Sequence, residues 1–428
     1  MRTAVRADPG TMAEEATATV GISYGLGGSP HCLLELTLQL SLAFAVALCV
    51  GWALVLVQVF RTTAAFQRLP ATLPDGDRVP PRVTAVIAAR DEGQTIEPAL
   101  RSLLAQEGVD LEVVVVDDMS SDDTADVVQR IVDEVGSKRL LLLPLKKLPP
   151  GWIAKNYALE IGQGRAHGDW LLFSDADVLH GRRAVYNAVV TMEKDRLDHL
   201  AVFPRLEAGS FVEALVLPLF VLMYQLRLVD PRAADADSGV GAGIGAFNMV
   251  RADSYRLRGT HARIRGSILD DRALAQMMRD EGGRGSVMRA VGQVRHRPYR
   301  SMREIYFGVK KSVLPQFAHS SVLAALAAAL LVMAAVAPMT LVLAGLPLWV
   351  SGRAPWLVLP AALAVLFPLI GLLRARTMVR FEPLAVLLFP VGAVIMAVSA
   401  MHAAIIFATR GTIEWRGRTY TRKDFENS

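Results

Sequence analysis

Several common sequence signals are missing from this chain of 428 residues. It has only two cysteines, Cys32 and Cys49, and both lie in or beside one apolar run, so we expect neither a disulfide framework nor a zinc site. No G-x-G-x-x-G follows the first expected strand and no Walker A motif is present, which removes the main support for dinucleotide or P-loop binding. The net charge of +5 comes without a nucleic-acid-binding motif and suits anionic lipid better.

Long apolar runs, by contrast, are abundant. The composition is 52% hydrophobic, and the excess lies in runs at 33–60, 322–350, 355–373 and 383–408. Each run is long enough to cross a bilayer, which takes about 20 helical residues. The first run is too long and begins too late for a secretory signal peptide. We therefore expect an integral membrane protein with these parts in order: a disordered N-terminus (1–31), a transmembrane helix (32–60), a linker (61–81), a catalytic domain (82–318), about three transmembrane helices (319–409) and a basic tail (410–428).

The basic residues predict an orientation in the cell membrane. Arg61 and Arg68 flank the first span, so the positive-inside rule places the N-terminus outside and residues 61–318 in the cytoplasm. Four spans would leave the basic tail outside, against the same rule. The run at 322–350 contains Pro338 and Pro347, so a tilted span and a short re-entrant hairpin are both open. Four spans are favoured, and the side of the tail stays undecided.

Strand and helix patterns alternate through residues 82–173. Strands are expected at 83–89, 112–116, 139–143 and 170–173, with helices at 95–106, 123–135 and 156–165. This alternation predicts an α/β fold with a mostly parallel, doubly wound sheet, whose ligands bind beyond the carboxyl ends of the strands. Acidic residues follow three of these ends, at 90–92, 117–118 and 175–177. We expect them to form one site.

Asp175 and Asp177 end the fourth of these strands. Two carboxylates at the end of a buried strand repel each other unless a cation joins them. Carboxylate oxygens suit Mg²⁺ or Mn²⁺. An Asp-x-Asp alone is weak support, because most such pairs lie in turns, so the value of this pair depends on the motifs around it.

Residues 211–229 are ambiguous. They are long enough to span a membrane but contain Glu213, Pro218 and Gln225. A crossing here would separate the acidic cluster from everything that follows. We expect an interfacial helix, either in the membrane plane or packed in the core, that docks the domain on the bilayer.

In their order, the motifs resemble those of the membrane-anchored family 2 glycosyltransferases of GT-A fold, nearest to the ceramide-glucosyltransferase-like and the hopanoid- or carotenoid-associated enzymes. The motifs lie at residues 86–92, 115–124, 151–156, 173–178 and 269–271, within a resemblance over about 82–320. Residues 415–420, after the last apolar run, also look like that group. The resemblance implies a Rossmann-like GT-A catalytic domain plus transmembrane helices.

The resemblance also implies a reaction: inverting transfer of a sugar from a nucleotide-sugar donor, of the UDP-sugar kind, to a membrane lipid. Asp177 would bind Mg²⁺ or Mn²⁺, and Asp175 would bind the metal or the ribose. The implied donor-binding residues are Ala89, Arg90, Glu92, Asp117, Asp118, Lys155 and Asp175. For Lys155, a place near the phosphates and a solvated helix start are both open.

Asp270 and Asp271 match the family's pair of acids after the metal motif, of which the second is the general base. A carboxylate there takes the proton of an acceptor hydroxyl as it attacks C1 opposite the diphosphate, which gives single displacement with inversion. Aspartate also favours helix N-caps, so Asp270 is expected to cap the helix at 272–278 while Asp271 acts as the base.

Two further features are left open. Residues 239–245 hold four glycines in seven positions, which fits either a close ligand approach or a flexible loop. His296 could reach the metal or the diphosphate, but a structural histidine is favoured. The family's Gln/Arg-x-x-Arg-Trp motif of processive enzymes is missing, so processive polymer synthesis is not expected.

Three other functions compete with lipid glycosylation. An inactive, transferase-like membrane scaffold is disfavoured because the acids at 118, 175, 177 and 271 are intact. A glycosyltransferase that acts on a polysaccharide is the nearer alternative. A nucleotidyltransferase would carry a glycine-rich, basic signature after the first strand, which residues 90–93 do not supply.

Overall fold

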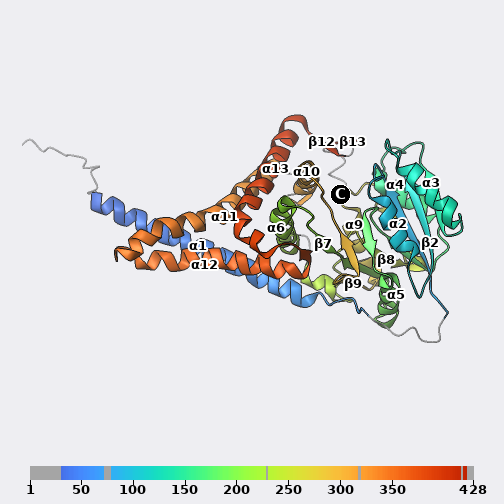
Figure 1. The fold of residues 1–428 in the computed structure, drawn as a ribbon, viewed down its shortest axis with the longest axis horizontal. Helices are drawn as coiled ribbons and strands as arrows, with labels where there is room; N and C mark the ends of the chain where they lie inside the picture. Colours follow the sequence, from blue (N-terminus) through green and yellow to red (C-terminus); the bar gives the residue numbers. More distant parts are fainter. Residues whose placement is uncertain (1–29, 72–78, 228–229, 317–319, 416–417, 422–428) are drawn as a thin grey trace, which may run out of the picture.

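The computed structural model of the chain describes residues 30–71, 79–227, 230–316, 320–415 and 418–421. Within them, a bundle of long apolar helices adjoins an α/β domain (Figure 1). The disorder expected for residues 1–31 falls almost wholly outside the described residues.

A seven-stranded sheet forms the centre of the α/β domain, in the order β3-β2-β1-β4-β8-β6-β9. Its strands are β1 (Arg82–Ala89), β2 (Asp110–Asp117), β3 (Leu140–Pro144), β4 (Trp170–Phe173), β6 (His199–Phe203), β8 (Asn248–Arg251) and β9 (Gly285–Arg289). The first four are parallel, β8 is antiparallel to β4 and β6, and β9 is parallel to β6. The predicted α/β fold with a mostly parallel sheet is confirmed, and the antiparallel β8 makes the sheet a mixed one.

Helices cover both faces of this sheet because alternate strand residues point to opposite sides. On β1, Val86 packs with Leu159 of α4, whereas Ile87 packs in the core that contains Leu100 of α2 and Val128 of α3. The helices of the domain are α2 (Ile96–Leu104), α3 (Thr124–Val135), α4 (Ala154–Gln163), α5 (Ala184–Lys194), η1 (Pro231–Ala234), α7 (Ala252–Leu257), α8 (Thr260–Arg263), α9 (Asp270–Arg279), η2 (Asp280–Gly282) and α10 (Met302–Gln316).

A second, four-stranded sheet connects the membrane helices to the α/β domain. Its order is β11-β7-β10-β5, formed by β11 (Val379–Arg380), β7 (Arg205–Glu207), β10 (Val294–His296) and β5 (Val178–His180). Strand β5 comes directly after Asp177, and β11 lies between two of the apolar helices. One small sheet therefore holds both a segment of the membrane region and the segment that follows the acidic motif.

Four described helical segments are long and apolar enough to cross a membrane. They contain α1 (Pro30–Ala65), α11 (Ser321–Val350), α12 (Pro355–Arg374) with η3 (Ala375–Thr377), and η4 (Pro383–Leu388) with α13 (Phe389–Arg410), after which come β12 (Thr412–Trp415) and β13 (Arg418–Thr421). Helix α11 is continuous through Pro338 and Pro347, so the re-entrant hairpin is wrong. Helix α1 runs on to Ala65, so the chain leaves the helix later than expected, and Leu69 then donates its N–H to Arg289 O at 2.9 Å.

Helix α6 (Phe211–Arg227) lies between the α/β domain and the apolar bundle (Figure 1). Its residues are buried on successive turns, including Glu213 and Leu219 at 0% and 1% exposure. Helix α13 packs closely on it, since a Cβ at Gly392 would lie 2.3 Å from Leu215 O. The burial of the described residues of α6, 211–227, agrees with the core-packed arrangement considered for residues 211–229.

Candidate active site

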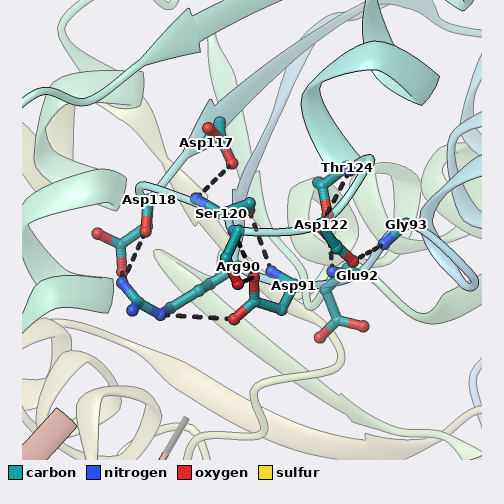
Figure 2. A network of polar contacts seen from close by, with 10 residues as sticks. Arg90, Asp91, Glu92, Gly93, Asp117, Asp118, Ser120, Asp122 and Thr124 are labelled. Atoms are coloured by element: carbon teal, nitrogen blue, oxygen red, sulfur yellow. Dashed lines mark hydrogen bonds and ion pairs between the residues drawn. The ribbon is translucent and has the colours of Figure 1, made fainter. Parts of the chain in front are cut away.

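The loops after β1 and β2 are joined by a local web of hydrogen bonds (Figure 2). Ala89 and Asp117 lie opposite each other at the ends of β1 and β2, so the loops that follow the two strands leave the sheet side by side. The Asp91 carboxylate accepts from the Ser121 N–H at 2.7 Å, and the Asp91 N–H donates to Ser120 Oγ at 3.0 Å. Asp91 has a φ of 52°, in the left-handed region that aspartate tolerates better than most residues. The strand ends are thus held by contacts between neighbouring loops.

The predicted donor residues meet at this edge of the sheet. Arg90 Nη1 donates to Asp118 O at 2.9 Å and lies 4.0 Å from Asp118 Oδ2. Asp117 and Asp118 are buried, at 6% and 4% exposure. Glu92 is buried too, and its carboxylate accepts from Thr95 Oγ1 at 2.6 Å. The Arg90 guanidinium beside the Asp118 carboxylate, with Asp117 and Glu92 nearby, gives this edge both hydrogen-bond donors and acceptors for a polar ligand (Figure 2).

Lys155 joins the acidic motif after β4 to the first residue of α9. Its Nζ lies 2.8 Å from Asp175 Oδ1 and 3.0 Å from Asp270 Oδ2. Burial opposes the charge on Lys155, but the two carboxylates outweigh it and raise the lysine pKa. The solvated helix start considered for Lys155 is not what the structure shows, because the ammonium is shared by two acids.

The capping role expected for Asp270 is wrong. Asp270 is the first residue of α9, the N-cap is Leu269, and no side chain caps the helix. The carboxylate turns to Lys155 instead. An ammonium at hydrogen-bond distance is a stronger partner for a buried carboxylate than a backbone N–H.

Asp271, the predicted base, is oriented by two backbone donors. Gly245 N donates to its Oδ2 at 3.1 Å, and Arg272 N donates to its Oδ1 at 2.8 Å. Burial and the nearby Asp270 raise its pKa to about 6, although Lys155 acts in the opposite sense. The carboxyl is therefore poised to take up a proton near neutral pH.

The glycine-rich loop 239–245 lies directly on the start of α9. A Cβ at Gly243 would lie 1.7 Å from Asp271 O, and a Cβ at Gly241 would lie 2.4 Å from Gln276 N. No side chain fits at either position without moving the helix. Of the two readings of this loop, close approach describes these two glycines, and the partner is the segment that carries the base.

His296 contacts Asp177, with Nε2 3.1 Å from Oδ2. The contact arises because β10 pairs with β5, where His296 lies opposite Val178, the residue after the acidic motif. Burial opposes protonation of His296, but Asp177 outweighs it and raises the histidine pKa. Sequence reasoning favoured a structural histidine here. Only the strand pairing, which the sequence pattern did not indicate, brings it to the motif.

Next to this histidine, an ion pair between Arg297, the residue after β10, and the buried Glu213 joins this segment to α6. Arg297 donates through Nε and Nη2 to the two oxygens of Glu213, at 2.9 and 2.8 Å. Glu213 also accepts from Gly209 N at 2.7 Å. The bidentate pair limits both the rotation and the translation of the residue beside His296.

The side chains after β4 suit a divalent cation whose remaining coordination positions are filled by a bound ligand. Asp175 and Asp177 offer carboxylate oxygens, and His296 offers an imidazole nitrogen beside Asp177. Among the described residues, no group of three or more acidic, histidine or cysteine side chains is arranged to hold a metal alone. Mg²⁺ and its relatives are often bound by one or two carboxylates plus substrate phosphates. The residues present therefore fit a cation bound together with a diphosphate.

Two helices of the membrane region reach the segments that carry the base and Lys155. Ile268 and Ile153 pack with Ala404 and Phe407 of α13. From α6, the hydroxyl of Tyr224 donates to Gly243 O in a long hydrogen bond of 3.4 Å. The base side of the site is thus built against apolar helices.

The chain shares sequence with several known proteins. Residues 84–246 match the Glycosyl transferase family 2 profile. The Succinoglycan biosynthesis protein ExoO of Rhizobium meliloti is 43% identical over 104 residues, 24% of this chain and 27% of that protein. The UDP-Glc:alpha-D-GlcNAc-diphosphoundecaprenol beta-1,3-glucosyltransferase WfaP of Escherichia coli is 29% identical over 115 residues, 27% of this chain and 43% of that protein. The matches span about a quarter to two fifths of these relatives.

A 4,4'-diaponeurosporenoate glycosyltransferase of Staphylococcus haemolyticus is 31% identical over 108 residues, 25% of this chain and 27% of that protein. Among solved structures, the mannosyltransferase PcManGT from Pyrobaculum calidifontis, in complex with GDP-Man and Mn²⁺, aligns with a TM-score of 0.50 at 18% identity. The alignment covers 86% of this chain and 98% of that one. At this identity the likeness establishes the shared fold.

Proposed function

Because residues 84–246 are a family 2 glycosyltransferase domain of GT-A fold, we propose that the protein transfers a sugar from a nucleotide-sugar, of the UDP-sugar kind, to a membrane lipid with inversion at C1. The observation that carries this proposal is the position of Asp271, which lies beside the Lys155–Asp175 pair and close to α6 and α13. A donor at the strand ends and an acceptor from the membrane would meet there.

Asp271 supplies the general base. Its two oxygens accept from Gly245 N and Arg272 N, and each keeps a further lone pair for the proton of an acceptor hydroxyl. As that proton moves to the carboxylate, the hydroxyl oxygen bonds to C1 and the bond from C1 to the diphosphate oxygen breaks. The bonding electrons leave with the nucleoside diphosphate, and no enzyme nucleophile is required.

On the donor side, Arg90, Asp117 and Asp118 bind the nucleoside, and Asp175 and Asp177 would hold Mg²⁺ or Mn²⁺, with His296 beside Asp177. The cation, when bound, would stabilise the negative charge that develops on the departing diphosphate. Lys155 keeps Asp175 and Asp270 together and supplies fixed positive charge near the same place.

A lipid acceptor is supported by the surroundings of the base. Phe407 of α13 and Tyr224 of α6 reach the segments that hold Asp271. Relatives named for a diphosphoundecaprenol and a diaponeurosporenoate acceptor point the same way. The relative named for succinoglycan biosynthesis keeps a polysaccharide acceptor as the second candidate.

We propose that the catalytic domain lies in the cytoplasm, where nucleotide sugars are made. Arg61 on α1, Arg374 at the end of α12 and Arg376 after it lie at the ends of these helices that adjoin the domain. The opposite turn, between α11 and α12, has Arg353 as its basic residue. The positive-inside rule then makes the domain side cytoplasmic.

The test is turnover of the purified full chain in proteoliposomes. UDP-glucose, UDP-N-acetylglucosamine and GDP-mannose are each supplied with polyprenyl phosphate, carotenoid acid, ceramide or a soluble oligosaccharide, with and without EDTA. We expect EDTA-sensitive transfer of one donor to a lipid, with inverted anomeric configuration. Transfer to the oligosaccharide alone would favour the polysaccharide enzyme, and no turnover with any donor would favour the inactive scaffold.

A further inference from the structure

Helix α13 differs from the other apolar helices in where its two ends lie. The far end of the bundle is a cluster made by α1, α11 and α12: Leu38, Leu42, Ala45, Leu341, Val342, Leu348, Ala354, Leu357 and Ala361. In Figure 1 these three helices extend together away from the α/β domain, whereas α13 stays beside it. The length and composition of α13 would allow a crossing, but its contacts follow a different course.

The beginning of α13 is tied to the catalytic side. Strand β11, just before it, pairs with β7 of the domain, with Leu206 N donating to Met378 O at 2.8 Å. Phe389, its first residue, packs on Trp52 of α1, with ring centroids 6.4 Å apart. Trp52 lies 14 residues beyond Leu38 of the far-end cluster (52 − 38), or about 21 Å along a helix at 1.5 Å per residue. Helix α13 therefore starts well short of the far end.

The end of α13 lies on the catalytic side as well. Phe407 packs with Ile268, immediately before the paired acids, and with Ile153, before Lys155. In the middle of α13, His402 Nδ1 lies 2.7 Å from the hydroxyl of Tyr306 on α10. The last turns of α13 thus pack on the catalytic domain, and its first residue packs on α1 short of the far end, so the contacts of the helix do not extend to the far end of the bundle.

The outer face of α13 is exposed and mostly apolar, and is interrupted by His402, which contacts Tyr306 of α10. Val391, Val394, Val398 and Ile405 are 39 to 63% exposed and recur at helical spacing. The opposite face is lined by small residues such as Ala393, Ala400 and Ala404, which are buried against neighbouring helices. A helix with one face packed on protein and one mostly apolar face open, next to three helices long and apolar enough to span, needs lipid on its open side.

We propose that α13 lies in the catalytic-side leaflet, with its open face in lipid, so that the chain crosses the membrane three times, through α1, α11 and α12, and returns the β12–β13 hairpin to the catalytic side. The four-span arrangement favoured from the sequence would place that hairpin on the opposite side. The three-span arrangement also keeps Arg410, the last residue of α13, on the side of Arg61 and Arg374.

The test labels single cysteines in a full-length background with Cys32→Ser and Cys49→Ala. Thr412→Cys reports the end of α13, Ser137→Cys reports the catalytic domain and Ser351→Cys reports the turn between α11 and α12. A membrane-impermeant maleimide is applied to intact cells and to inverted vesicles. We expect residue 412 to label from the same side as residue 137 and opposite to residue 351. Labelling of residue 412 together with residue 351 would overturn the proposal.

A second measurement finds what covers the open face. Spin labels on Val391→Cys and Ile405→Cys are compared for collisions with oxygen, which enriches in lipid, and with a water-soluble nickel complex. The residues are 14 positions apart (405 − 391), about 21 Å on an upright helix. We expect high oxygen access and a depth within the catalytic-side leaflet at both positions. A label in the far leaflet would show a crossing, and low access to both reagents would show a protein partner instead of lipid. Neither readout needs turnover, so these results stand apart from those of the transfer assay.

Discussion

The donor end and the base end of the site are held in different ways. At the donor end, residues of two adjacent loops hold one another, as in the Asp91–Ser121 contact between residues 30 positions apart. At the base end, the partners come from distant segments: Asn156 on α4 donates to Ser267 O at 2.9 Å, 111 positions away, and Lys155 Nζ lies 3.0 Å from Asp270 Oδ2, 115 positions away (270 − 155). The donor end can thus form within the α/β domain alone.

The base end depends on what packs behind it. The segment that precedes α9 is held by Asn156 on one side and by Phe407 of α13 on the other. The glycine loop that orients Asp271 is in turn touched by Tyr224 of α6. Changes in the membrane region should therefore alter transfer to the acceptor while donor binding persists. Each prediction below separates these two ends or tests their link.

The largest effect is expected from the loss of Asp177. Asp177→Ala removes a proposed cation ligand and the partner of His296. We expect donor affinity and turnover to fall together, with turnover reduced by about 10³-fold, because charge stabilisation on the leaving group is lost. Titration calorimetry with UDP and Mn²⁺, followed by turnover, measures both.

Asp169→Ala is the matched control, since this acid is exposed, pairs with Arg82, and lies at the other end of β4. We expect near-normal activity from it. Normal turnover by Asp177→Ala would remove the metal assignment, whereas equal damage by Asp169→Ala would point to general loss of folding.

The second largest effect should separate the base end from the donor end. Asp271→Asn keeps the shape of the side chain but cannot accept the proton, so we expect kcat to fall by about 10²-fold or more. The dissociation constant of the donor, measured by calorimetry, should change little. A loss of donor affinity with no specific loss in kcat would assign Asp271 to structure.

The pH profile provides an independent check on the same residue. The raised pKa of about 6 means that Asp271 is protonated, and inactive as a base, below that pH. Wild-type kcat should rise with pH through about 6 and then level off. The remaining activity of Asp271→Asn should lack this rise, and an unchanged rise in the variant would trace the ionisation to another group.

The close approach of the glycine loop gives a third, smaller effect. A methyl group at Gly243 would lie 1.7 Å from Asp271 O, so Gly243→Ala must push the loop or α9 away. Because small displacements of reacting groups are costly, we expect about a tenfold loss in kcat with unchanged donor binding. Gly164→Ala is the control, since its added methyl group meets its nearest atom at an ordinary 3.4 Å. Equal kcat for the two variants would show that the loop yields freely.

The residues of the site also differ in how well the sequence predicts their positions. The acids after β1, β2 and β4 follow buried, β-branched or leucine-rich runs, and the sheet places the ends of these strands side by side, as the pattern indicated. For His296 a structural role was favoured over contact with the metal or diphosphate, because its position depends on the pairing of β10 with β5, which no local pattern encodes.

Contacts between distant segments explain the other differences between the expectations and the structure. Asp270 has the composition of a helix cap, but Lys155, 115 positions earlier (270 − 155), attracts it more strongly. Pro338 and Pro347 left a re-entrant hairpin open as an alternative to a tilted span, yet the helix continues through both, as apolar helices often do where neighbours satisfy the freed backbone groups. The burial of α6 depends on α13, which lies far away in the sequence.

The smallest effect is expected at the ion pair of Glu213 and Arg297, through which α6 could influence the donor end. Glu213→Gln keeps the size of the side chain but removes the charge that holds Arg297, next to His296. If that pair positions the histidine, apparent Mn²⁺ affinity in the presence of UDP should fall about 3- to 10-fold, less than the 10- to 100-fold typical for a direct partner of a metal ligand.

Glu207→Gln is the control, because this acid of the same small sheet lies 3.7 Å from Arg295 on the other side of the histidine. Reduced thermal stability with unchanged Mn²⁺ affinity would limit the pair to a structural role, and an equal loss in both variants would mean that the sheet responds as a whole. A loss confined to Glu213→Gln would instead show that the helix packed against the membrane region also sets the geometry at Asp177.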